Sequence, residues 1–146
     1  MKQENKDLLL RDLCGRLPYG IKCSFGVDDA IYIIEGINPN CCGASEIQAT
    51  HLESSINGDF RINSCKPYLY PLSSMTKKQK EELKNLGWNF DNFEIHNINE
   101  CLGTYREFVT HLDCSVLIDW LNKNHFDYRS LIPKGLAINC INLNIY

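Results

Sequence analysis

The chain has 146 residues, of which 44% are hydrophobic and 23% charged, and its formal net charge at pH 7 is −3. Its length is near the commonest size of one folded domain, and such a chain buries roughly two-thirds of its unfolded surface; we predict a single domain over residues 1–146. The acidic balance, with a pI near 5.8, disfavours broad electrostatic binding to nucleic acid or anionic lipid, because both require a positive surface.

The first third of the chain predicts a helix followed by strands. Leucines at helical spacing predict a helix from Lys6 to about Arg16. Alternating apolar and polar residues over 21–25 are typical of a half-buried strand, and the β-branched run over 30–37 predicts a second. A third strand is expected around Ile47 and Ala49. Asn57-Gly58-Asp59 is a strong turn signal.

The strands continue to residue 72. The segment from Lys66 to Leu72 contains Pro67 and Pro71, which have no amide hydrogen, so we predict an edge strand or an extended crossing there.

Helices are predicted after this segment. Thr76 is expected to cap a surface helix that ends at Gly87, with Gln79 in the capping-box position. A short strand is predicted over 90–95, and the longest helix from Thr104 to about Lys123. The weak alternation over 136–140 predicts a last strand.

Strands and helices are thus segregated along the chain. This order predicts an α+β fold: a small antiparallel, curved sheet or partial barrel of four to six strands, with two or three helices.

The sequence also bears on compartment and thiol state. The only early apolar run is Leu8-Leu9-Leu10, too short for a secretory signal, and no stretch approaches the ~20 apolar residues of a membrane helix. We therefore expect a cytoplasmic protein with no membrane partner. A cytoplasmic compartment keeps cysteines reduced, so the eight cysteines are expected to be thiols rather than four disulfides.

Three segments carry a resemblance: residues 66–76 (KPYLYPLSSMT), residues 119–137 (DWLNKNHFDYRSLIPKGLA), and Leu8 to Cys23. Together they resemble small uncharacterised proteins of gut Bacteroidales and of their phages and prophages. The resemblance implies a phage or mobile-element accessory factor, with interference in host defence as one role. It brings no catalytic motif and assigns no functional residue.

One set of residues has the types that zinc prefers: His96, Cys101, His111 and Cys114. Zinc takes four nitrogen or sulfur ligands in a tetrahedron, but this spacing matches no standard finger or knuckle. Buried thiols with hydrogen-bonded histidines are the alternative interpretation, and we favour it, so no cofactor is expected. Cys41-Cys42 with His51 suggests either a redox site or a Cys/His nucleophile pair, but we favour a loop with two incidental thiols.

The most suggestive binding residues are aromatic and basic. Lys66, Tyr68 and Tyr70 would share one face of an extended strand, and Tyr19 lies in a turn. They could present stacking faces and a cation to a nucleotide or peptide. The alternative is a strand that packs its tyrosines on the core. The cluster after the long helix (Trp120 and residues 125–129) is expected to cap that helix and lock the following chain.

Three classes of function remain. A non-enzymatic protein that binds a host protein leads, a binder that sequesters a small signalling nucleotide comes second, and a small metal-assisted or hydrolytic enzyme comes third. The absence of phosphate-cradling, dinucleotide and nucleophile-elbow motifs disfavours the enzyme. Homo-oligomerisation stays open.

Overall fold

A computed structural model describes residues 1–26, 30–41, 44–88 and 114–146. Three α-helices and seven strands lie in these residues, together with three short 3-10 turns. The helices are α1 (Gln3–Arg16), α2 (Lys77–Asn85) and α4 (Cys114–Lys123). The strands are β1 (Lys22–Ser24), β2 (Tyr32–Cys41), β3 (Ala44–His51), β4 (Asn57–Arg61), β5 (Lys66–Pro71), β6 (Phe126–Asp127) and β7 (Ile138–Asn139). The 3-10 turns are η1 (Leu17–Tyr19), η2 (Ile62–Ser64) and η3 (Leu72–Ser74).

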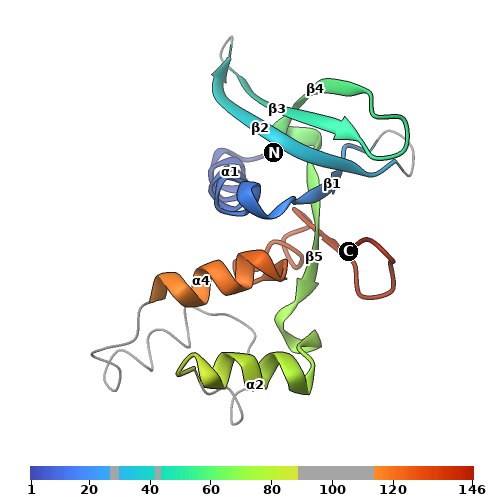
Figure 1. Ribbon diagram of the computed structural model, residues 1–146. Helices are drawn as coiled ribbons and strands as arrows, with labels where there is room; N and C mark the ends of the chain where they lie inside the picture. Colours follow the sequence, from blue (N-terminus) through green and yellow to red (C-terminus); the bar gives the residue numbers. More distant parts are fainter. Residues whose placement is uncertain (27–29, 42–43, 89–113) are drawn as a thin grey trace.

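The strands form one curved, unclosed sheet in the order β4-β3-β2-β1-β5-β6, with β7 also paired to β5 (Figure 1). The pairs among β1 to β5 are antiparallel, whereas β6 and β7 run parallel to β5. The predicted α+β class is therefore confirmed. The two short parallel strands make the sheet mixed, because the chain returns to β5 only after the helices.

The expectation that residues 66–72 form an edge strand is wrong. β5 pairs with β1 on one side and with β6 and β7 on the other. The remaining backbone groups carry this pairing: the amide of Tyr70 donates to the carbonyl of His125 at 2.9 Å, and the amide of Cys140 donates to the carbonyl of Leu69 at 3.0 Å. A strand with two prolines can therefore lie inside a sheet, provided that its other amides and its carbonyl groups form the hydrogen bonds to both neighbours.

The predicted turn at Asn57-Gly58-Asp59 is also wrong. These residues begin β4, and the chain reverses over residues 52–55 instead. Ser55 has a φ of 55°, and His51 Nδ1 accepts the Ser54 amide at 3.0 Å. Asn57 acts as a cross-strand partner, since its side-chain oxygen accepts the Thr50 hydroxyl at 2.8 Å.

Three hydrophobic clusters surround β5. The first joins α1 to the sheet, the second packs α2 against α4, and the third lies under residues 138–146. Figure 1 shows β5 running from the sheet toward α2 and α4. Leu69 belongs to the first cluster and Tyr68 to the third, while Tyr70 packs against the second and third. β5 is thus the element that connects the three clusters.

Helix α2 begins as predicted. Thr76 Oγ1 accepts the Gln79 amide at 3.3 Å, and the Gln79 side chain accepts the Thr76 amide at 2.9 Å. Only Leu83 is buried, so the helix lies on the surface. The predicted strand over 90–95 and the part of the predicted long helix before Cys114 lie outside the described residues. None of the helices described is long and apolar enough to cross a membrane.

Candidate functional site

The four predicted ligand residues lie in two places. Lys66 is exposed at the start of β5, whereas Tyr68 is only 7% exposed and Tyr70 is half-buried. Tyr19 lies in η1, where partial burial first, and then the carboxylate of Asp119, raise the pKa of its hydroxyl. Tyr19 is therefore engaged with α4 rather than with β5.

Tyr68 and Tyr70 lie together, but this chain covers them. Tyr68 packs with Cys140 and Ile145, and the ring centroid of Tyr70 lies 6.1 Å from that of Tyr146. In this conformation the two tyrosines form a small core, as in the alternative interpretation of the sequence.

The predicted metal set cannot be placed as a whole. His96, Cys101 and His111 lie outside the described residues, and Cys114 is described only as the first residue of α4. Elsewhere in the described chain, no group of three or more His, Cys, Asp or Glu side chains is arranged to hold a metal ion. The zinc site stays a prediction.

Tyr146 occupies a position that sequence reasoning did not single out. Its ring stacks on His125 with centroids 3.8 Å apart and planes 10° from parallel. Its hydroxyl accepts the Lys22 amide and donates to the Tyr68 carbonyl, both at 3.1 Å. The Lys22 ammonium lies 5.3 Å from the ring centroid and donates to the carbonyl of Ile145. We call this arrangement the aromatic slot: Lys22, Tyr68, Tyr70 and His125, with Tyr146 in place.

His125 forms one wall of the aromatic slot and has an unusual environment. It is 8% exposed and its φ is 57°, a left-handed conformation that few residues other than glycine adopt. Burial, followed by the positive charges of Arg16 and Lys22, lowers the pKa of its imidazole to about 4. Its Nδ1 is buried without a hydrogen-bond partner among the described residues. The imidazole is therefore neutral at physiological pH.

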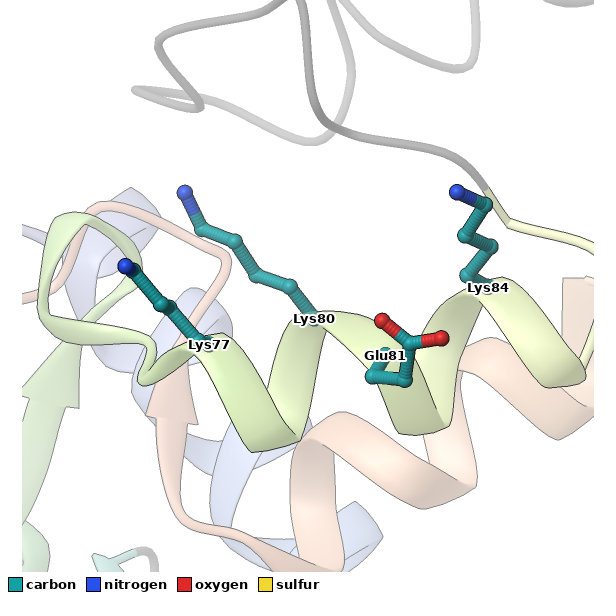
Figure 2. A pocket seen from close by; sticks show the side chains of 4 residues that line it. All are labelled: Lys77, Lys80, Glu81 and Lys84. Atoms are coloured by element: carbon teal, nitrogen blue, oxygen red, sulfur yellow. The ribbon is translucent and has the colours of Figure 1, made fainter.

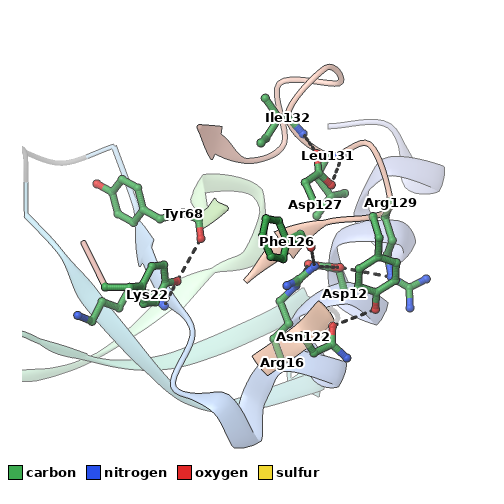
Figure 3. Close-up of polar contacts among 12 residues, drawn as sticks. Asp12, Arg16, Lys22, Tyr68, Asn122, Phe126, Asp127, Arg129, Leu131 and Ile132 are labelled. Carbon is green, nitrogen blue, oxygen red and sulfur yellow. Dashed lines mark hydrogen bonds and ion pairs between the residues drawn. The ribbon is translucent and has the colours of Figure 1, made fainter. Parts of the chain in front are cut away.

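Figure 3 shows a charged network that joins Asp12, Arg16 and Arg129. Arg16 is fully buried and pairs with Asp12 through Nε at 2.7 Å and Nη2 at 3.1 Å. Arg129 reaches the same carboxylate at 3.3 Å. Both guanidinium groups lie over the Tyr128 ring, at 5.2 and 4.9 Å from its centroid. This network ties α1 to the chain after α4.

The neighbouring carboxylate, Asp127, also organises backbone. Its two oxygens accept the amides of Leu131 and Ile132, each at 2.8 Å. Together with the Tyr128 hydroxyl, which donates to Asn122 at 3.0 Å, this contact fixes the chain after α4. The expectation that residues 125–129 lock the following chain is confirmed.

The outer face of β2, β3 and β4 carries an acidic hollow of about 280 Å³. Glu35, Gln48, Asn57 and Asp59 line it with their side chains, and Ala49 and Gly58 complete its wall. A register shift in β2 between Ile34 and Gly36 places Glu35 beside the Gly36–Gln48 pair, and Asp59 pairs with Gln48 from the other side. We call Glu35, Gln48 and Asp59 the acidic row.

A second hollow, of about 370 Å³, lies on α2 (Figure 2). Lys77, Lys80 and Lys84 line it at helical spacing, and Glu81 lies between them. Three of these four side chains are exposed, so the hollow is part of a solvated helix face.

No protein-family model, no curated protein and no solved structure matches this chain. The case for function therefore depends on the geometry of these groups.

Proposed function

We propose that this protein is a non-enzymatic binding protein that docks an extended segment of a partner protein along β4. The observation that carries the proposal is the position of β4 at the end of the sheet. Among the described residues β4 pairs with β3 alone, through five consecutive registered pairs from Asn57 to Arg61. A strand at the end of a sheet presents a row of backbone donors and acceptors that an extended peptide can join.

The side chains of β4 also suit a bound strand. Burial alternates along β4, so that Asn57, Asp59 and Arg61 are exposed. Asp59 lies on β4 itself, next to the position of a partner strand, whereas Gln48 on β3 and Glu35 on β2 lie one and two strands farther from that position. We infer that the partner segment carries a lysine or arginine opposite Asp59, because a basic side chain would complement this charge.

The interior supports binding over catalysis. Asp12 and Arg16 are paired with each other, and Asp127 accepts two backbone amides. These buried charged groups are used to hold elements together, whereas the acidic row lies on an exposed face. The resemblance to Bacteroidales phage proteins favours a host protein as the partner.

The test uses short peptides that alternate lysine with valine or threonine, added to isotope-labelled protein. We expect nuclear magnetic resonance (NMR) shifts to be largest at the amides of residues 57–61, with slowed hydrogen exchange there. Asp59→Lys should weaken binding at least tenfold, since it opposes a basic residue. Glu53→Lys, in the exposed turn before β4, makes the same charge change away from the acidic row and should leave affinity within twofold.

Two results would count against docking along β4. One is an absence of shifts in residues 57–61 with every peptide of the panel. The other is binding that Asp59→Lys and Glu53→Lys weaken equally, which would indicate general charge attraction.

A further inference from the structure

The aromatic slot holds Tyr146 through contacts that a separate molecule can also make. The phenol ring lies flat on the His125 imidazole, beneath the Lys22 ammonium, and the hydroxyl bonds to two backbone groups. Each of these contacts is directed to the ring or to its oxygen. None depends on the Tyr146 backbone.

The chemistry of the slot selects a hydroxyl group. The Lys22 amide can only donate and the Tyr68 carbonyl can only accept, and both meet one oxygen at 3.1 Å. A hydroxyl serves both partners at once, whereas a carbonyl oxygen or an unsubstituted ring leaves at least one of them unpaired. The slot is therefore matched to a phenol rather than to any planar ring.

The walls of the slot do not depend on Tyr146. Lys22 and Tyr68 belong to paired strands, and the His125 carbonyl is held by the Tyr70 amide at 2.9 Å. By contrast, residues 140–146 contain no helix or strand. Cys140 and Ile145 are buried in the third cluster and anchor this segment, whereas Tyr146 itself is 39% exposed. The Tyr146 ring can therefore leave the slot while the preceding chain stays packed.

We propose that the aromatic slot is a phenol-binding site that Tyr146 fills from within the chain, and that an external phenolic ring competes with Tyr146 for it. This inference is independent of β4 and of its partner. A tethered ring acts at an effective concentration on the order of millimolar. The apparent affinity for an external phenol is therefore the intrinsic affinity multiplied by the fraction of molecules in which the slot is open. Tyr146 therefore sets the threshold concentration for binding.

The test compares wild type with Tyr146→Ala, using p-cresol as the probe and isothermal titration calorimetry at pH 7.5 as the readout. We expect Tyr146→Ala to bind p-cresol at least tenfold more tightly than wild type, because the competitor is removed. Toluene, which has the ring without the hydroxyl, should bind the variant at least tenfold more weakly than p-cresol. Val116→Ala, at an exposed site on α4, should leave the wild-type affinity unchanged.

N-acetyl-tyrosinamide distinguishes the source of the phenol. Binding as tight as that of p-cresol indicates a tyrosine of another polypeptide, and exclusion of the amide indicates a free phenol; the site stands in both cases. Equal binding of toluene and p-cresol, or no binding of p-cresol by a folded Tyr146→Ala, would overturn the proposal.

A second measurement keeps the test decisive if Tyr146→Ala fails to fold. In wild type, p-cresol should move the ring resonances of Tyr146 toward their free values, while His125 keeps the upfield shift that a stacked ring causes. If neither residue responds up to the solubility limit of p-cresol, the slot is a permanent anchor and the proposal fails.

Discussion

The Nη2 of Arg16 donates to the carbonyl oxygen of Phe126 at 2.6 Å, which joins the last residue of α1 to the first residue of β6. Arg16 is fully buried, and its Nη1 has no hydrogen-bond partner among the described residues. Asp12 supplies the only full negative charge that the described contacts give to this guanidinium. The contact between α1 and β6 therefore depends on Asp12 remaining in place.

Asp12→Ala should destabilise the protein strongly. It leaves the buried Arg16 without its counter-charge, and removal of one member of a buried ion pair costs about 3 to 5 kcal/mol. Urea unfolding followed by circular dichroism should show this loss. Asp7→Ala, an exposed site on the same helix, is the matched control and should cost at most about 0.5 kcal/mol.

The double variant Asp12→Leu with Arg16→Met tests whether the loss in Asp12→Ala comes from the unpaired charge of Arg16. Replacing both buried charges with apolar side chains removes their desolvation cost together with their attraction, so we expect stability closer to wild type than to Asp12→Ala. Arg129 also loses the Asp12 carboxylate, but its side chain is 24% exposed and can be hydrated. A double variant less stable than Asp12→Ala would show that packing, rather than charge, dominates this site.

The protein should lose stability as the pH falls from 6.5 to 4. The folded protein keeps His125 neutral down to its pKa of about 4, whereas the unfolded chain takes up the proton near 6.5. Protonation in this window therefore favours unfolding. The stability that neutral His125 supplies is complete above pH 6.5, and about 3 kcal/mol of it is lost by pH 4.

The variant His125→Asn isolates this effect. Asparagine tolerates a φ near 57° and does not titrate, so urea unfolding across pH 4 to 7.5 should give a shallower pH dependence than wild type. The variant keeps Arg16 and Lys22, the charged groups that, after burial, lower the pKa of His125. Identical slopes for the two proteins would assign the acid sensitivity to other groups.

The cysteines should differ in reactivity. Cys14 is exposed, whereas Cys23, Cys65 and Cys140 are buried free thiols. Burial raises the pKa of Cys140 to about 11 and that of Cys65 well above its ordinary value, which lowers their thiolate fraction. Under native conditions iodoacetamide should label Cys14 at least tenfold faster than these buried thiols. Peptide mass spectrometry gives the rates, and labelling in urea is the control in which the difference disappears.

Asp127 should stabilise the chain after α4 through two backbone bonds. Asp127→Ala removes both acceptors from the amides of Leu131 and Ile132, at a cost of about 2 to 3 kcal/mol. Asp127→Asn keeps one acceptor oxygen and should lose about half as much. Thermal unfolding compares the two, and equal losses would mean that the negative charge, rather than the number of acceptors, matters.

Some local features, such as a helix cap, were predictable from the sequence, whereas long-range pairing was not. The capping box of Thr76 and Gln79 depends only on residues three apart, so its pattern is visible in the sequence. The inner position of β5 depends on β6 and β7, which come from a distant part of the chain. No local rule shows that Pro67 will lie opposite Cys23 in a paired strand.

The candidate sites also depend on long-range contacts, which is why the sequence identified them only in part. Tyr68 and Tyr70 were identified as neighbours on one strand face, but the residue that covers them, Tyr146, has no sequence motif. Its role appears only when Lys22 and His125 are brought together by the fold. Likewise, the acidic row depends on the pairing of Asp59 with Gln48, which the expected turn at residues 57–59 would have prevented.

The late arrival of β6 and β7 has a consequence during synthesis on the ribosome. β5 acquires its parallel partners only when residues 126–139 have left the exit tunnel. The hydrogen bond from Arg16 to the carbonyl of Phe126 also cannot form before that point. Until then a nascent chain exposes one side of β5 and the apolar surface around Leu69. Such non-local contacts slow folding and leave intermediates open to aggregation, so the chain should depend on chaperones while it is translated.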